Sequence, residues 1–361
     1  MNIKYVSDWQ NVINRFEEWW VRADTNKPLM RIVAPGRKGE TASLVVPEQI
    51  EEQYLSAEYI VSKYRNFCET HFFFSEAYPS ISLDLGPGSM ALYLGGEPGF
   101  AEDTIWFREF MDDCEQFDTI HYDEKNKWWN IQQEMLKKAV SLAKEDFYVN
   151  IPDIVENLDI LSALRGPQEL CYDILDKPDC IRRGVEKIDD LYFNYFDRCR
   201  DIVKADDNTN SYTAFNILGY GRTAKIQCDF CALISPDMFR EYVQLSLRRQ
   251  CCQLDHSVYH LDGPDAIKHL DALMEIEELD ALQWTCGAGQ PDGACEKWYP
   301  IYDKVRSAGK GLWIMMNDGG PEDWENGMKR LVDRYGKRGM YFLFPTFPDM
   351  ESARRMDCFF D

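Results

Sequence analysis

The stretch Ser257-Val258-Tyr259-His260-Leu261-Asp262-Gly263-Pro264 decides how the fold is predicted. It has the pattern of a short strand that stops at Gly-Pro. Side chains of a strand alternate between its two faces, so His260 and Asp262 share one face. An imidazole beside a carboxylate suits proton transfer or metal binding. In a β/α barrel, the carboxyl ends of the strands carry the active site, so this stretch predicts a site if the fold is such a barrel.

Short apolar strands alternate with helices from residue 257 onward, which is typical of a parallel sheet. Eight strands are expected, at residues 29–34, 72–76, 147–151, within 213–228, 257–262, 281–284, 311–316 and 340–344. This number favours a closed (β/α)8 barrel, or TIM barrel, over an open doubly wound sheet. The predicted fold is therefore a single α/β domain over residues 1–361, with an N-terminal helical extension at 1–28 and loop insertions.

The composition excludes some classes of partner. The chain of 361 residues has 40 Lys and Arg against 62 Asp and Glu, a formal net charge of −22, so nucleic acids and anionic membranes would be repelled. No stretch approaches the roughly 20 apolar residues of a membrane helix. The 12 cysteines are scattered and no leader is visible, so we expect a cytoplasmic protein with reduced thiols. A small-molecule substrate is expected, and either a monomer or a homodimer is compatible with the sequence.

Several residues at expected strand ends are candidates for the site. Glu76 follows three phenylalanines, so burial would raise its pKa and suit it to proton donation; the alternative is a loop carboxylate that caps a turn. Gln283 and Trp284 would offer an amide and a stacking ring at the barrel mouth, or fill the barrel. The other candidates for substrate binding are Arg31, Tyr78, Asp153, Asn157, Asn317 and Thr346.

Four motifs, in their order along the chain, resemble the uroporphyrinogen decarboxylase superfamily. They are Phe74-Ser75-Glu76, the stretch 159–166 (DILSALRG), Ile234-Ser235-Pro236 and His260-Leu261-Asp262-Gly263. The superfamily includes porphyrinogen decarboxylases and zinc methyltransferases that act on methylated corrinoids, and the resemblance implies a TIM barrel. Toward the decarboxylases, Phe-Ser-Glu resembles Phe-Ser-Asp, which would place Glu76 where a carboxylate orients pyrrole nitrogens. Arg31 matches their arginine-rich N-terminal motif only loosely.

Toward the methyltransferases, His260-Leu261-Asp262-Gly263 resembles a His-x-Cys-Gly zinc motif, with a carboxylate in place of the thiolate. Gln283 stands where the next strand can offer a Glu, and Thr346 is the nearest match to the last Cys. This resemblance implies that His260 and Asp262 bind zinc or another divalent metal, and that a partner protein carries the corrinoid.

Three functions remain open from the sequence. The first is methyl transfer involving a corrinoid or a small methylated substrate, with the metal or reacting group held by His260 and Asp262, oriented by Gln283, and the proton handled by Glu76. The second is metal-independent decarboxylation of a porphyrinogen-like or other polycarboxylate, which would be a lyase reaction. The third is non-catalytic ligand binding by a barrel without the thiolates.

Overall fold

The computed structural model describes residues 3–212 and 215–360, and its centre is a sheet of seven strands. Residues 213 and 214, which begin the range of the expected fourth strand, lie outside the described residues. Neighbouring strands are parallel except β2 and β1, which pair in antiparallel fashion. The order in the sheet is β2 (His71–Ser75), β1 (Leu29–Pro35), β13 (Met340–Leu343), β12 (Gly311–Met315), β11 (Ala281–Thr285), β10 (His256–Asp262) and β9 (Thr223–Gln227). The α/β class and the parallel central sheet are thus confirmed.

The closed barrel is not confirmed, because the pairing in the described residues does not close the sheet. The other strands form three separate pairs: β3 (Ser80–Ile81) with β6 (Tyr148–Val149), β4 (Glu97–Phe100) with β5 (Ile105–Arg108), and β7 (Thr209–Tyr212) with β8 (Ile217–Tyr220). The antiparallel β2 occupies the edge of the sheet beside β1. At the other edge, the side chain of Asn210 in β7 donates to the carbonyl of Thr223 in β9 (3.0 Å), in place of a backbone ladder.

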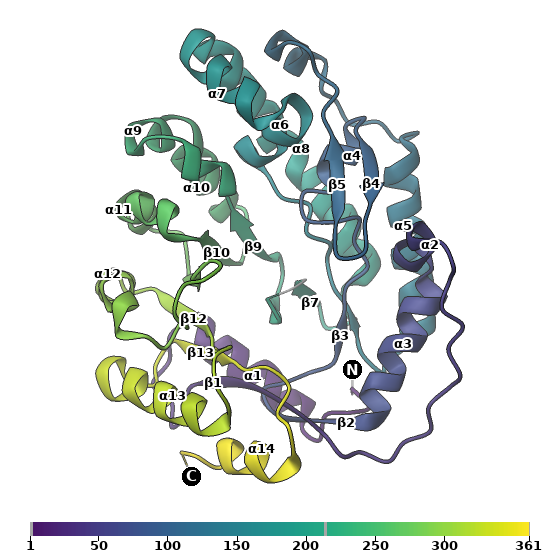
Figure 1. Ribbon diagram of the computed structural model, residues 1–361, viewed down its shortest axis with the longest axis vertical. Coiled ribbons are helices and arrows are strands. Elements are labelled where there is room, and N and C mark those ends of the chain that lie inside the picture. The colour runs from purple at the N-terminus through teal and green to yellow at the C-terminus, as the bar shows by residue number, and fades with distance from the viewer. Residues whose placement is uncertain (1–2, 213–214, 361) are drawn as a thin grey trace.

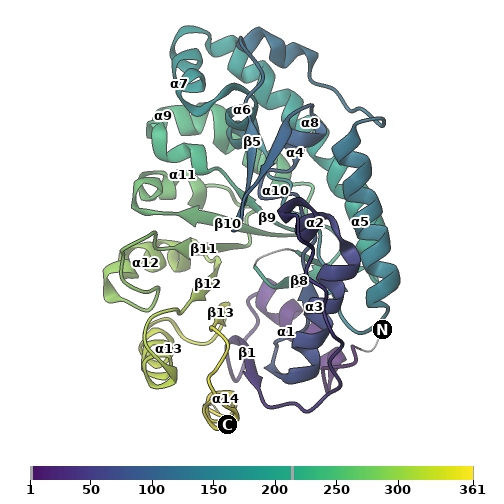
Figure 2. The same cartoon turned by 45° about the vertical axis from the view of Figure 1, so that its right-hand side comes forward.

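The helices between residues 236 and 335 follow one another around the outside of the strands in chain order (Figure 1 and Figure 2). Buried side chains of the helices recur every three to four residues, as in Ile181, Val185, Ile188, Tyr192 and Phe196 of α8. Among the described residues, no helix has the length and apolar character that crossing a membrane requires. The helices are α1 (Trp9–Trp20), α2 (Ile50–Leu55), α3 (Ala57–Thr70), α4 (Met90–Tyr93), α5 (Lys127–Ala143), α6 (Asn157–Arg165), α7 (Pro167–Asp176), α8 (Pro178–Val203), α9 (Pro236–Phe239), α10 (Leu245–Cys251), α11 (Leu270–Met274), α12 (Tyr299–Ser307), α13 (Pro321–Tyr335) and α14 (Met350–Asp357).

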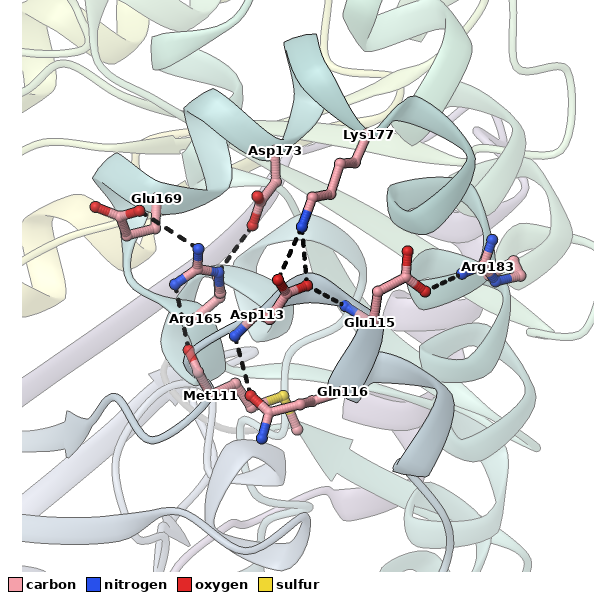
Figure 3. A network of polar contacts seen from close by, with 9 residues as sticks. All are labelled: Met111, Asp113, Glu115, Gln116, Arg165, Glu169, Asp173, Lys177 and Arg183. Atoms are coloured by element: carbon pink, nitrogen blue, oxygen red, sulfur yellow. Dashed lines mark hydrogen bonds and ion pairs between the residues drawn. The ribbon is translucent and has the colours of Figure 1, made fainter.

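The loop insertion before α5, here residues 111–119, is held on helices α6 to α8 by the polar network of Figure 3. Asp113 caps the short helix η1 (Cys114–Thr119) and accepts hydrogen bonds from Lys177 (2.9 and 3.0 Å). Arg165, the last residue of α6, donates to Asp173 (2.8 Å) and to the carbonyl of Met111 (3.3 Å). The insertion therefore adds to the packing of α6, whose first residue is one of the candidates for the site.

A buried ion pair joins α1 to the amino end of β1. Glu76, 1% exposed, accepts from Arg15 (3.0 Å) and from the backbone N–H of Met30 (2.8 Å). Arg15 also donates to the carbonyls of Lys27 and Pro28, just before β1 begins. Because β2 runs antiparallel to β1, the residue after β2 lies at the amino edge of the parallel strands. Burial raises the pKa of Glu76, and the Arg15 guanidinium opposes that shift.

We predict that the Arg15→Met variant loses about 3–5 kcal/mol of unfolding free energy, because it leaves the Glu76 carboxylate buried and unpaired. Chemical denaturation followed by circular dichroism measures this loss. Lys329→Met removes an exposed ion pair on α13 and is the control, with an expected change below about 0.5 kcal/mol. Similar losses in the two variants would contradict the assigned role of the buried pair.

His256 at the start of β10 predicts an acid-sensitive contact. Its ring stacks on Trp20 of α1 (4.6 Å between centroids), with Glu17 at 3.7 Å, and burial lowers its pKa from 6.5 to about 4. The neutral ring is favoured in the folded state, so its contribution to stability is present above about pH 6.5 and is lost as pH falls toward 4. Wild type should therefore lose about 2 kcal/mol relative to His256→Phe between about pH 7.5 and about pH 5. An equal change in unfolding free energy for the two proteins between these pH values would contradict this prediction.

Candidate functional site

The register of the parallel strands aligns polar side chains at one edge of the sheet. Paired residues of neighbouring strands project from the same face. Gln227 of β9 pairs with His260 of β10, which pairs with Gln283 of β11. Asp262, two residues beyond His260, pairs with Thr285. His260 and Asp262 thus share a face at the carboxyl end of β10, as the alternation of the strand predicts.

A third acidic residue completes a cluster with these two. Asp229, His260 and Asp262 each offer one ligand atom, and these three atoms lie within 4.8 Å of one another. The two aspartates are exposed and His260 is half-buried, so the cluster is open to solvent. Asp229 begins the short helix η2 (Asp229–Leu233), directly beyond the end of β9. Asp229 was not among the residues predicted from the sequence, although it follows Gln227 by two residues, as Asp262 follows His260 by two residues.

The ring of His260 is oriented by Gln283. His260 Nδ1 bonds to Gln283 Oε1, and Gln283 Nε2 donates to Thr285 Oγ1 (2.8 Å). An amide oxygen only accepts, so Nδ1 carries the proton and Nε2 keeps a free lone pair. Burial and the charge of Lys225 lower the pKa of His260. The imidazole is therefore neutral at physiological pH, in the form that binds a metal or accepts a proton.

The edge carries more carboxyl groups than cations. Desolvation by the surrounding protein and the charge of neighbouring Asp159 raise the pKa of Asp229, although part of its side chain reaches solvent. Glu156 is fully buried and burial raises its pKa well above the usual range. The ammonium of Lys225 pairs with Asp153 at 2.6 Å. Lys225 also lies near Glu156 and Asp229, and Asp159 and Asp262 lie near Asp229, so carboxyl groups outnumber this lysine and make the edge receptive to a cation.

Three of the other predicted residues lie toward this face. Asp153 holds Lys225, and Asn157, with a positive φ of 46°, donates to the carbonyl of Gln227 (2.7 Å). Arg31 of β1 pairs with Leu343, and Leu343 pairs with Met315, along the face that carries His260. The Arg31 guanidinium is half-buried; its Nη1 donates to the carbonyl of Phe344 (3.5 Å), and its Nε has no hydrogen-bond partner among the described residues.

Two predicted residues, Asn317 and Thr346, are exposed beyond β12 and β13. Asn317 lines a depression of about 520 Å³ together with Asp262, Thr285 and Cys286. Thr346 has no described contact with the cluster. The depression borders the cluster through Asp262 and has room for a small substrate.

Three expectations are corrected by the structure. Trp284 follows Gln283 and so projects from the opposite face, where its ring packs on Trp298 (5.0 Å between centroids), although the residue also borders the depression beside Asp262. Tyr78 is buried against Trp9 and Phe16 of α1. Glu76 lies at the amino edge of the parallel strands, whereas His260 lies at the carboxyl edge, so the structure does not bring Glu76 to the cluster.

Comparisons with known proteins relate this geometry to one fold. No family model matches the sequence, and no curated protein sequence matches it significantly. Among solved structures, a methyltransferase from Methanosarcina mazei matches with a TM-score of 0.63, covering 97% of this chain and 98% of that chain at 11% sequence identity. Sequence identity this low indicates a common fold and leaves the activity to be argued from the site. The chain is therefore similar in fold, over nearly its whole length, to that methyltransferase.

Proposed function

We propose that the protein is an enzyme that transfers a methyl group at the carboxyl edge of its parallel sheet. The observation that carries the proposal is the cluster of Asp229, His260 and Asp262, with three ligand atoms within 4.8 Å, at the edge where enzymes with parallel sheets bind substrate. The fold similarity to a methyltransferase favours this chemistry. We also propose that the protein belongs to the uroporphyrinogen decarboxylase superfamily and that its strands close into a TIM barrel.

The donor set fits a divalent metal. One imidazole and two carboxylates suit zinc and also harder metals such as manganese or iron. No cysteine belongs to this cluster among the described residues, and burial raises the pKa of the nearby Cys231 thiol to about 12. A metal held by His260, Asp262 and Asp229 would supply Lewis acidity that lowers the pKa of a hydroxyl, amine or thiol on the methyl acceptor.

The chain's own groups would prepare the site for the acceptor. Gln283 holds His260 in the tautomer in which Nε2 keeps a free lone pair. The depression beside Asp262 would take the body of a small substrate. Arg31, whose Nε is unpartnered, would attract a negatively charged part of it. Because the two aspartates are exposed, a corrinoid carried by a partner protein could approach as methyl donor.

Decarboxylation of a polycarboxylate is less compatible with this edge. The aspartates gathered near Asp229, which are Asp153, Asp159 and Asp262, would repel a substrate with many negative charges. Glu76, the residue expected to orient pyrrole nitrogens, forms a structural ion pair at the other edge. We therefore favour methyl transfer.

We predict that protein purified without chelator binds about one equivalent of divalent metal, because three donors converge. Elemental analysis and isothermal titration calorimetry with zinc and manganese measure this. His260→Ala and Asp262→Asn should weaken binding by at least about 100-fold, since each removes a ligand. Asp318→Asn is the matched control, because Asp318 lines the same depression but is not in the cluster, and it should bind as wild type does. Equal losses in the control, or a wild type without metal, would refute the metal site.

We also predict that methylcobalamin is demethylated in the presence of a small thiol, amine or alcohol acceptor, and that His260→Ala lowers the rate by at least about 100-fold. The visible absorbance of the corrinoid follows the reaction. Asp333→Asn, which removes only the exposed ion pair with Lys329 on α13, should retain the rate. Release of carbon dioxide from polycarboxylates would point to the decarboxylase alternative, and ligand binding without turnover would point to a non-catalytic barrel.

A further inference from the structure

Lys225 is a buried lysine on the face of β9 that carries the site. Its side chain has no solvent exposure, and it lies two residues before Gln227, the partner of His260. A buried ammonium is unfavourable unless its donors are satisfied. Lys225 Nζ donates to Asp153 Oδ1 (2.6 Å) and to Gln227 Oε1. The lysine thus links a buried carboxylate to an amide at the edge of the sheet.

This contact fixes which way the Gln227 amide points. An ammonium only donates, so it requires the amide oxygen of Gln227 and turns the NH2 group away from itself. That NH2 group donates to Asp229 Oδ2 (2.9 Å) and to Asp159 Oδ2 (3.0 Å). Glu156 accepts from the backbone N–H of Gln227 (2.6 Å), which holds the backbone as well. The amide therefore has one orientation in which all its groups are satisfied.

Gln227 and Gln283 flank His260 in the same row of the sheet. Gln283 orients His260 itself, with Thr285 behind it. Gln227 orients Asp229, with Lys225 behind it. Each glutamine presents to the cluster the group that its neighbour needs: an oxygen toward the imidazole N–H and an NH2 toward the carboxylate.

We propose that Lys225 is a positioning residue that acts through Gln227 to hold the Asp229 carboxylate beside His260 and Asp262. The proposal rests on the proposed function insofar as Asp229 is a donor of the site. Without the ammonium, the Gln227 amide is free to turn its oxygen toward Asp229, and the cluster loses its buried counter-charge. Asp229 is exposed, so its carboxylate would then move into solvent and away from His260.

The test compares two buried lysines. Lys310 is 4% exposed and its Nζ donates to the carbonyls of Ile276 (2.6 Å) and Leu279 (2.8 Å), at the amino end of β12 and away from the cluster. Lys310→Met therefore reproduces the loss of a buried, satisfied ammonium. Zinc affinity is measured by calorimetry for the full chain. Lys225→Met should weaken zinc binding about 10- to 100-fold, whereas Lys310→Met should stay within about twofold of wild type.

A second variant tests the same inference if Lys225→Met does not fold. Gln227→Leu breaks the link to Asp229 but leaves the pair of Lys225 with Asp153, and it should weaken zinc binding as Lys225→Met does. Unchanged affinity in Lys225→Met or Gln227→Leu, or an equal loss in Lys310→Met, overturns the inference.

Crystal structures of the same variants separate this inference from the proposed function. If wild type binds no zinc, the metal part of the proposed function fails, and the position of Asp229 decides the inference alone. The inference holds if the Asp229 carboxylate leaves His260 in both the Lys225→Met and the Gln227→Leu variant and stays in place in Lys310→Met. It fails if Asp229 keeps its position in either site variant.

Discussion

The in-register parallel pairing of β9, β10 and β11 is the constraint on which the site depends. It places Gln227, His260 and Gln283 side by side. Because the side-chain period of a strand is two, a shift of one residue would turn His260 away from the site. The register is held from behind the sheet, where Tyr259 and Leu261 are buried at 1% and 0% exposure. Hydrophobic packing on one face thus fixes the polar geometry on the other.

The charge distribution at this edge opposes folding and favours binding. Burial raises the pKa of both Glu156 and Asp229, since like charges gather where water is partly excluded. A fold selected for stability alone would avoid this arrangement, and departures of this kind are typical of functional sites. A bound cation would relieve the repulsion. The acidic edge therefore supports the proposal that a metal ion binds there.

The sequence predicted what depends on local alternation. The strands from β10 onward and the common face of His260 and Asp262 follow from periods of two residues and from Gly and Pro at strand ends. The same rule separates Gln283 from Trp284, whose side chains project from opposite faces of β11. The direction of β2 was not predictable, because an apolar strand fits a sheet in either direction. Closure was not predictable either, since it depends on pairing between segments far apart in the chain, where β3 and β6 are only two residues long.

Two carboxyl groups with raised pKa values, those of Glu76 and Asp229, lie at opposite edges of the sheet and differ in their exposure to solvent. Burial raises the pKa of Glu76 and of Asp229 alike. Glu76 is 1% exposed and its two oxygens already accept from Arg15 and from the N–H of Met30, so a ligand from solvent does not reach it. Asp229 is exposed and its neighbours offer further donor atoms within 4.8 Å. A raised pKa alone therefore does not identify a site, and in this chain the carboxyl group that solvent can reach is the one suited to chemistry.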